Sequence, residues 1–382
     1  MIILGIETSC DETALSLVES SGNLEHPKFK VLSTSLFSQT KLHEIHGGVV
    51  PMLAKREHQK NLIPLLKNLL EKANFSNPKS ETQNSKQIEE IKKILEREQE
   101  LALLFIEYIP TIEKPNVDAI AVTYGPGLEP ALWVGVSFAK ALSYIWNIPI
   151  IPVNHMEGHI VSPLFTAGTK IEFPALALLI SGGHTELVLT EKWGEYKVIG
   201  KTRDDAVGEA FDKVARLLGL PYPGGPQISI LAEKQRQSGI ASTLALPRPM
   251  INSNDYDFSF SGLKTSVLYK LKEIGKPSEK NKEEIAREFE DAVTEVLVAK
   301  TKQAIEEFGP QSLIIAGGVS ANSHIRKSFE KLAEEFPQTK LLIPGKELST
   351  DNAIMIAGAG YINFLLKKES NSLKAEGNLQ LG

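Results

Sequence analysis

The sequence predicts an α/β protein built from two lobes that share one fold. Short apolar runs alternate with amphipathic stretches through most of the 382 residues, which is typical of layered α/β domains. One order of elements also occurs twice: a strand, a polar turn with Thr and Glu, and further strands follow Ile2 and again follow Phe173. Because 42% of the residues are hydrophobic, the chain can bury two cores. We therefore expect an internal duplication with a ligand between the halves.

The first half is expected to hold five strands and three helical stretches. Leu53, Leu62 and Leu66 share one side of a helix at the spacing expected for an amphipathic segment. A second helical stripe runs from Ile88 to Ile109. The expected strands are 2–6, 14–18, 28–37, 117–122 and 148–153, and the other helices are 51–72 and 130–145. We place the N-terminal lobe at residues 1–153.

The second half is expected to form a C-terminal lobe at residues 154–366. Its middle, 226–308, is mostly helical, and the charged run 276–284 within it is interpreted as a linker. The polar tail 367–382 is expected to be frayed. The expected strands are 175–180, 184–189, 196–200, 312–316 and 341–343, and the expected flanking helices are 207–218, 322–336 and 351–366.

Composition limits the classes of function. The formal net charge is −5, whereas dedicated nucleic-acid binders are usually basic, so any RNA contact requires a local basic patch or a partner. A single cysteine, Cys10, excludes an intrachain disulfide and fits a reducing compartment. The first residues do not resemble a targeting peptide, and no uncharged apolar run reaches the roughly 18–20 residues that a membrane span needs. We therefore expect a cytoplasmic protein without membrane contact.

A histidine pair follows one of the expected strands. If the segment is helical, His155 and His159 occupy positions i and i+4 on one face, about 5–6 Å apart at Cβ. Two imidazoles so placed can converge on one metal ion, although they can also simply line a cleft. The zinc-peptidase motif needs a glutamate directly after the first histidine. Glu157 stands one position too late, and this excludes that motif.

Two glycine turns follow expected strands. Ser181-Gly182-Gly183 lies between two strands, where backbone N–H groups can approach an anion. Gly317-Gly318 precedes an expected helix, whose N-terminus favours phosphate. Each turn could instead need glycine only for its backbone geometry.

Two acidic residues complete the candidate set. Asp351 precedes the last expected helix and could be a metal ligand or only a helix N-cap. Asp11 lies in the acidic, hydroxyl-rich turn of the first hairpin. That turn could face phosphates through a metal ion, or it could be an ordinary exposed turn.

Taken together, these motifs resemble the universal tRNA N6-adenosine threonylcarbamoyltransferase family, formerly described as glycoproteases, in its bacterial type. The segment Asp257–Thr265, with the sequence DFSFSGLKT, is the most distinctive match. The matching stretches run in family order through nearly the whole chain: Gly5–Thr13, Gly47–His58, Gly125–Gly135, Asn154–His159, Ser181–Glu186, Asp204–Gly225, Asp257–Thr265, Gly317–Asn322 and Ser349–Ala357.

The resemblance implies a fold and a reaction. The fold is that of actin, sugar kinases and Hsp70, in which two ribonuclease-H-like lobes surround a nucleotide. The implied enzyme is an acyltransferase. Its donor is threonylcarbamoyl-AMP, its acceptor is N6 of the adenosine 3′ to the anticodon in tRNAs that read codons beginning with A, and AMP is released.

The resemblance also implies roles for individual residues. His155, His159 and Asp351 match the ligands of one divalent metal ion, usually assigned as iron, with zinc as the alternative. Asp11 is the candidate for a catalytic role. The positions that match donor-binding residues are Leu179, Ile180, Ser181, Gly182, Gly183, Asp212, Gly225, Ser229 and Asn322.

The resemblance further implies tRNA, an inactive paralogue and a small ATPase as partners. Residues from about 77 to 115 form an insertion relative to the compact family pattern, and the apolar side of its helical stripe must pack on this protein or on a partner. Two alternatives stay open. One is a phosphotransferase of the same fold, which would not need the histidine pair. The other is a non-catalytic scaffold paralogue, which would typically have lost the metal ligands.

Overall fold

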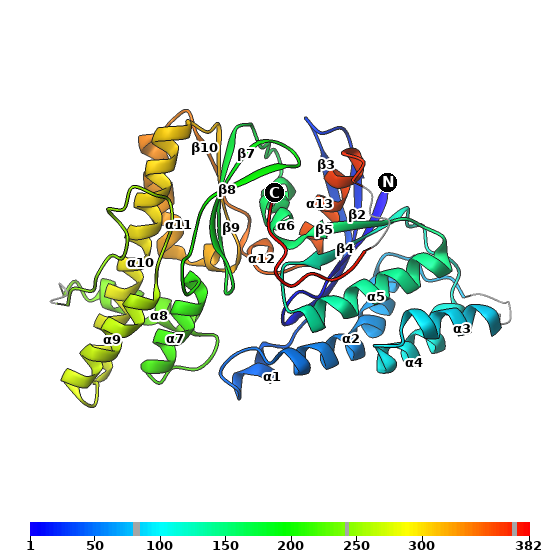
Figure 1. Ribbon diagram of the computed structural model, residues 1–382, viewed down its shortest axis with the longest axis horizontal. Coiled ribbons are helices and arrows are strands. Elements are labelled where there is room, and N and C mark those ends of the chain that lie inside the picture. Colours follow the sequence, from blue (N-terminus) through cyan, green and yellow to red (C-terminus); the bar gives the residue numbers. More distant parts are fainter. Residues whose placement is uncertain (79–84, 241–243, 369–372) are drawn as a thin grey trace. The chain divides into compact units, whose positions relative to one another are not determined.

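Figure 1 shows the computed structural model of the chain, which describes residues 1–78, 85–240, 244–368 and 373–382. The chain forms two compact units. Unit 1 comprises Met1–Gly168 and Asp351–Leu381, and unit 2 comprises Thr169–Thr350 together with Gly382. This division differs from the expected one between residues 153 and 154. The histidine segment and the last helix both belong to unit 1, because that helix packs across all five strands of the first sheet.

Unit 1 contains a five-stranded sheet in the order β3-β2-β1-β4-β5. The strands β1, β2 and β3 form an antiparallel meander, whereas β4 and β5 run parallel to β1. The carboxyl ends of β1, β4 and β5 therefore meet at one edge of the sheet. The bounds are β1 Ile2–Glu7, β2 Glu12–Ser21, β3 Lys28–Ser38, β4 Ala119–Gly125 and β5 Ile150–Asn154.

Helices cover both faces of this sheet. The side chains of Leu4 and Ile6 join the core beneath α2 and α5, while Gly5, between them, lies against Ala353 and Ala357 of α13. A Cβ at Gly5 would overlap the carbonyl oxygen of Ala353, so this glycine permits close packing of helix on strand. The helices of unit 1 are α1 Thr40–Glu44, α2 Pro51–Lys72, α3 Ser85–Ile94, α4 Gln99–Tyr108, η1 Ile109–Thr111, α5 Glu129–Trp146, α6 His155–Val161, η2 Ser162–Phe165 and α13 Ala353–Leu365.

Unit 2 repeats the topology of unit 1. Its sheet has the order β10-β9-β6-β7-β8, in which β6, β7 and β8 form the antiparallel meander and β9 and β10 are parallel to β6. The α/β class with two lobes of the same design is thus confirmed. The bounds are β6 Ala175–Ile180, β7 Thr185–Lys192, β8 Glu195–Lys201, β9 Ser312–Ala316 and β10 Lys340–Leu342.

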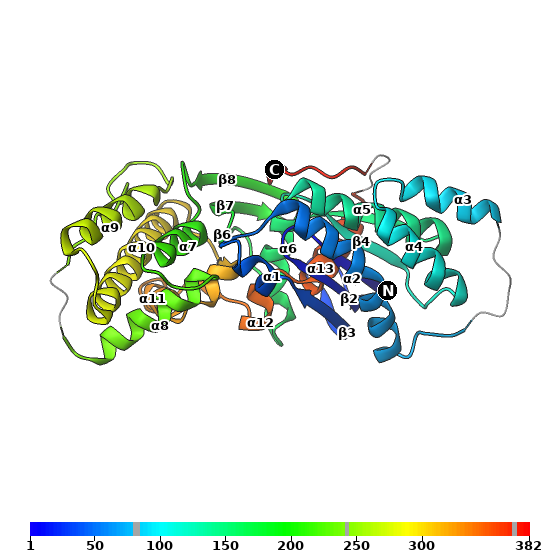
Figure 2. The same cartoon turned by 90° about the horizontal axis from the view of Figure 1, so that it is seen from below.

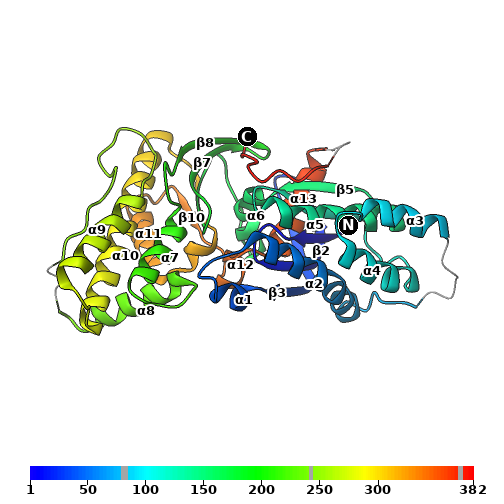
Figure 3. The same cartoon turned by 60° about the horizontal axis from the view of Figure 1, so that its bottom comes forward.

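The second core includes Leu176, Leu178 and Ile180 of β6, and the helices of unit 2 lie beside its sheet (Figure 3). The interpretation of 276–284 as a linker is wrong. Ser278 and Asn281 form a capping box that begins α10 within this charged run, and a capping box satisfies two otherwise unpaired backbone donors. The helices are α7 Val207–Leu217, α8 Gly224–Gln237, α9 Ser261–Ile274, α10 Glu279–Phe308, η3 Gly318–Ala321, α11 Ser323–Glu335 and α12 Lys346–Ser349.

The expected insertion contains two helices rather than one long stripe. Helix α3 packs on α5, and α4 packs on α2 (Figure 2). The prediction of one continuous helical stripe is wrong because the chain turns between Leu95 and Glu98. In this turn the Glu98 N–H donates to the Leu95 carbonyl (2.8 Å). Residues 79–84 of the insertion lie outside the described residues.

The C-terminal tail is packed where it was expected to be frayed. Leu373 and Leu381 are buried. The Glu376 N–H donates to the Tyr124 carbonyl (2.8 Å), and the Gly377 carbonyl accepts from Gly127 N–H (3.0 Å). These bonds fix the tail along the turn that follows β4. Residues 369–372 lie outside the described part of the chain. Among the described helices, none has the length and apolar composition required to cross a membrane.

Candidate functional site

The histidine pair lies on a short helix that begins where β5 ends. Asn154 caps this helix, since its side-chain oxygen accepts from the Met156 N–H (2.9 Å). The cap starts the helix at His155 and so places His155 and His159 one turn apart, with ring centroids 4.8 Å from each other. Both imidazoles are buried. The expected i, i+4 arrangement is therefore present.

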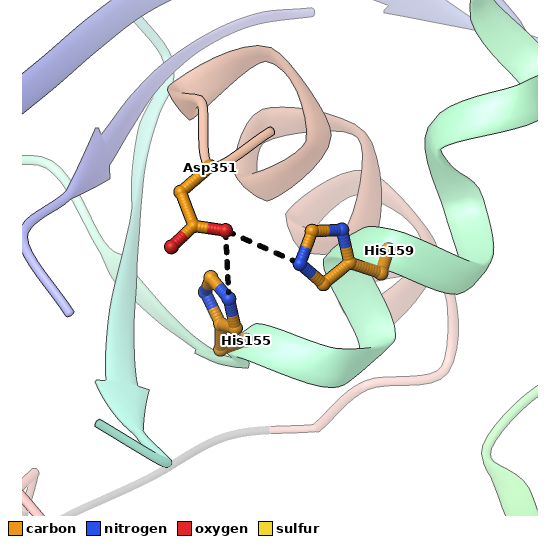
Figure 4. Close-up of side chains that lie close together, drawn as sticks. All are labelled: His155, His159 and Asp351. Carbon is orange, nitrogen blue, oxygen red and sulfur yellow. Dashed lines mark ion pairs between the residues drawn. The ribbon is translucent and has the colours of Figure 1, made fainter. Parts of the chain in front are cut away.

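Asp351 supplies the third side chain of the cluster. Its Oδ1 lies 3.3 Å from Nε2 of His155 and 3.3 Å from Nε2 of His159 (Figure 4). The N-cap of α13 is Asn352, whose side chain accepts from Met355 N–H (3.0 Å), so the interpretation of Asp351 as an N-cap is wrong. All three side chains belong to unit 1.

The contacts of His155 determine which of its nitrogens carries a proton. Its Nδ1 lies 3.1 Å from Oε2 of Glu7, and a carboxylate oxygen can only accept. Nδ1 is therefore the donor, and in the neutral ring Nε2 presents its lone pair to Asp351. Both ring nitrogens of His159 lack a hydrogen-bond partner among the described residues. The three ligand atoms lie within 4.8 Å of one another. Two imidazole nitrogens and a carboxylate oxygen that converge in this way can hold a cation once Nε2 of His155 has given up its proton.

Electrostatics support the same conclusion. Burial favours the uncharged form of every group here, and it lowers the pKa of His159. In His155, burial is outweighed by Asp351 and Glu7, and the pKa is raised well above its ordinary value. Burial likewise opposes ionisation of Asp351, but the two histidines hold its pKa well below its usual range. The cluster thus keeps a buried carboxylate ionised beside two imidazoles, which is a suitable ligand set for a divalent transition metal.

Glu7 is a site residue that the sequence reasoning did not single out. It ends β1, where its Oε1 accepts from the Ser9 N–H and its Oε2 from the Thr123 hydroxyl (2.6 Å). A carboxylate that holds the outer nitrogen of a ligating histidine fixes its tautomer and orientation. The available signal was topological: the carboxyl ends of the parallel strands β1 and β5 lie at the same edge of the sheet.

Glu157 lies in the same helix but has a structural role. Its Oε2 accepts from Asn363 Nδ2 (2.8 Å), and its Oε1 accepts from Lys368 Nζ (2.8 Å). These contacts connect α6 to the end of α13. The exclusion of the zinc-peptidase motif is consistent with this use of the carboxylate.

The turn that contains Asp11 is held from beneath by a buried histidine. Nε2 of His58 donates to the Cys10 carbonyl (2.9 Å), and its Nδ1 accepts from the Thr13 hydroxyl (2.7 Å). Gln39 extends this network to His43 through its side-chain oxygen (3.2 Å). Both histidines are fully buried. Asp11 itself is nearly buried. Among the described residues, it makes no hydrogen bond or ion pair with His155, His159 or Asp351.

The two glycine turns of unit 2 lie side by side. They follow the neighbouring parallel strands β6 and β9. A Cβ at Gly317, which has φ +93°, would overlap the backbone of Ile180, so this glycine is needed for close approach. At Gly182, Gly183 and Gly318 a Cβ would meet nothing within 4 Å. The Cα positions of these three residues therefore border open space, and the Gly183 N–H donates to the Ser181 hydroxyl (3.3 Å).

The other candidate donor-binding residues cluster around the start of α8. Oδ1 of Asp212 accepts from the Gly224 N–H (2.7 Å), and a Cβ at Gly225 would meet open space. Nδ2 of Asn322 donates to the Ser229 hydroxyl (2.8 Å), while its oxygen caps α11. Ser229 and Asn322 share a second partner, the carboxylate of Glu290.

Glu290 is the second residue that sequence reasoning missed. Its Oε1 accepts from Ser229 (2.8 Å) and from Asn322 (2.6 Å), its Oε2 pairs with Arg236, and it is almost fully buried. The side chains of Leu179 and Ile180 are also fully buried, so only their backbone is available to a ligand. The structure thus gathers the metal-ligand candidates in unit 1 and the donor-binding candidates in unit 2.

Comparison with known proteins identifies the family. The model of the family described as tRNA N6-adenosine threonylcarbamoyltransferase matches residues 30–81 and 109–358. Curated proteins of this name are similar over nearly the whole chain. That of Persephonella marina is 44% identical and covers 97% of this chain and 92% of its own length. That of Thermosipho africanus is 42% identical and covers 100% of both.

A third curated relative, from Chromobacterium violaceum, is 43% identical over 94% of this chain and 92% of its own length. Among solved structures, T. kodakarensis HypF is similar with a TM-score of 0.50 and 13% identity, covering 70% of this chain and 44% of its own, which speaks for the fold alone. The sequence matches extend through both units and include the histidine pair, Asp351 and the glycine turns. The chain therefore belongs to the tRNA N6-adenosine threonylcarbamoyltransferase family.

Proposed function

We propose that this protein transfers the threonylcarbamoyl group from threonylcarbamoyl-AMP to N6 of the adenosine 3′ to the anticodon, in tRNAs that read codons beginning with A. The proposal rests on family membership together with one observation, the convergence of His155, His159 and Asp351 at the sheet edge. A non-catalytic paralogue would have no reason to keep this ligand set. In the reaction, a bond forms between N6 and the carbamoyl carbon, the bond from that carbon to the phosphate oxygen breaks, AMP leaves with the electron pair, and one N6 proton is released to solvent.

His155, His159 and Asp351 would hold one divalent metal ion, and we propose iron(II), with zinc as the alternative. Two imidazoles and one carboxylate suit either ion and leave coordination positions open. When bound, the ion supplies Lewis acidity toward a substrate oxygen. The contribution of the protein is to fix the ligands: Glu7 holds His155 through Nδ1, and Asn154 starts the helix that presents both rings.

The donor would bind to unit 2 through Asp212, Gly225, Ser229, Asn322 and the turns after β6 and β9. Open space beside the Cα atoms of Gly182 and Gly183 leaves room for a phosphoryl group to approach this turn. An exocyclic adenine amine is a weak nucleophile, so positioning of donor and acceptor would contribute more than basicity. The target base must also leave the anticodon-loop stack to be reached.

We propose that an inactive paralogue and a small ATPase assist the reaction in the cytoplasm. The net charge of −5 gives no overall attraction for tRNA phosphates, so productive docking should need partner surface. We also propose Asp11 as a catalytic residue, because it lies in the turn directly after Ser9, which contacts His155 (3.3 Å).

A reconstituted assay tests the function. The protein, both partners, threonylcarbamoyl-AMP and an unmodified tRNA are combined, and AMP release and modified nucleoside are measured. We expect multiple turnover with the partners, little without them, and strongly reduced turnover for Asp11→Asn. AMP release without nucleoside formation, or phosphoryl transfer from ATP to a sugar, would contradict the proposal.

A further inference from the structure

Two segments of the chain lie outside the match to the family model, and both pack near one helix that lies inside the match. The unmatched residues 82–108 contain α3, α4 and the turn between them, and the C-terminal tail lies beyond residue 358, where the match ends. Helix α5, at 129–146, is matched. Helix α3 packs on α5 (Figure 2), and Leu373 of the tail joins the core that α5 helps to form.

Each of these three elements contributes a cation to the same place. Arg97, from the turn between α3 and α4, has its Cζ 4.9 Å from the centroid of the Trp133 indole. The Nζ of Lys140, two turns further along α5, lies 5.6 Å from the same centroid. Lys374 follows Leu373, which is buried in the core that α5 helps to form; burial lowers the pKa of Lys140, and the charges of Lys374 and Arg97 lower it further.

Among the described residues, none of Arg97, Lys140 and Lys374 pairs with a carboxylate. The nearby carboxylate of Glu98 is fully buried and is already paired with Lys55 (3.1 Å). Arg97 and Lys374 are exposed, and Lys140 and Trp133 are half-buried. In a chain with a net charge of −5, these three cations, which have no ion-pair partner among the described residues, remain available to an anionic ligand.

We infer that Arg97, Lys140, Lys374 and Trp133 form a docking surface for the phosphate backbone of tRNA. Phosphate oxygens are the usual partners of clustered Arg and Lys in nucleic-acid complexes. The indole holds Arg97 and Lys140 in place by cation–π contacts, which lowers the entropy lost when they meet a phosphate. Because such contacts carry no sequence information, this surface positions the tRNA and does not select it.

This inference rests on the proposed function, and its test measures binding of a full-length tRNA transcript to the complete protein in the presence of both proposed partners, as a function of salt. Each phosphate contact contributes roughly 0.7–0.9 to the slope of log K against log salt. The variant with Arg97→Gln, Lys140→Gln and Lys374→Gln should therefore lose about 2 units of slope and about eightfold in affinity per lost contact near 0.1 M salt. Lys28→Gln is the matched control, since Lys28 is exposed on β3, at the opposite edge of the sheet from β5.

The purely structural alternative makes a different prediction. If the cluster only attaches the insertion and the tail to α5, the triple variant should melt at a lower temperature and retain the salt slope of the parent protein. That result would overturn the inference, and so would an equal loss of slope in Lys28→Gln. A reduced slope at an unchanged melting temperature supports it.

Discussion

At the scale of single residues, the site depends on side chains that local sequence patterns cannot identify. His155 and His159 were predictable because their spacing is that of one helical turn. Glu7 was not, because its role arises only when β1 and β5 bring their carboxyl ends together. Glu290 was missed for a similar reason, since it reaches Ser229 and Asn322 from the middle of α10.

The first prediction concerns Glu7. Glu7→Gln removes the carboxylate that holds Nδ1 of His155, so the imidazole loses its fixed tautomer. Loss of such an outer partner typically costs 10–100-fold in metal affinity. We expect about tenfold weaker binding of zinc or iron(II), measured by competition with a chelator. Glu157→Gln, which changes a carboxylate on the same helix that faces away from the ligands, should bind metal like the parent, and equal weakening in both variants would contradict the assignment.

The second prediction concerns pH and His58. Burial lowers the pKa of His58 to about 4, against the small opposing effects of the Cys10 carbonyl, Glu7 and Glu57. In the unfolded chain the value is about 6.5, so between these values the unfolded state binds more protons. The free energy of unfolding should therefore fall as the pH drops from about 6.5 toward 4, by about 2–3 kcal/mol from this residue.

His58→Gln removes this titration while keeping an amide that can donate to the Cys10 carbonyl. Urea unfolding of both proteins at several pH values measures the difference. The stability of the variant should decline less steeply below pH 6.5. Parallel curves for the two proteins would show that His58 does not titrate in this way.

At the scale of elements, the sequence was most informative where hydrophobic runs are short and bounded by glycine. The strands at 175–180 and 312–316 have the expected bounds, because each apolar run stops at a turn. The charged run at 276–284 was wrongly predicted to be a linker, because the capping box at Ser278 starts a helix inside it. The tail was wrongly predicted to be frayed. Its polar residues are held by backbone hydrogen bonds, which amino-acid composition does not reveal.

The third prediction separates two kinds of glycine. Gly183→Ala should leave stability nearly unchanged, because its Cβ would meet nothing within 4 Å, yet it should weaken binding of AMP by narrowing the approach to the backbone. Gly317→Ala should destabilise unit 2, because its Cβ would overlap the Ile180 backbone at a positive φ. Thermal melts and calorimetry with AMP measure both effects. Unchanged affinity in a folded Gly183→Ala protein would contradict the donor-binding role of this turn.

At the scale of the whole molecule, the repeated order of elements correctly indicated a duplicated topology, which both sheets follow. The boundary between the units was not predictable in the same way. Asp351 and α13 follow the second half in sequence but pack on the first sheet, against Gly5. The chain returns to the first unit because of long-range packing, and no local sequence pattern around residue 351 predicts this.

The central claim is that this ligand cluster supports modification of tRNA. Asp351→Asn is the most selective change, since Asn352 already caps α13 and the helix should keep its stability. The variant loses the only carboxylate among the three candidate ligands. We therefore expect it to fold normally, to bind little metal and to be inactive.

The most direct measurement is mass spectrometry of tRNA nucleosides from cells depleted of this protein and supplied with either the parent gene or Asp351→Asn. The account predicts that N6-threonylcarbamoyladenosine disappears on depletion, returns with the parent gene and stays absent with the variant. Persistence of the nucleoside after depletion, or its full return with Asp351→Asn, would contradict the account.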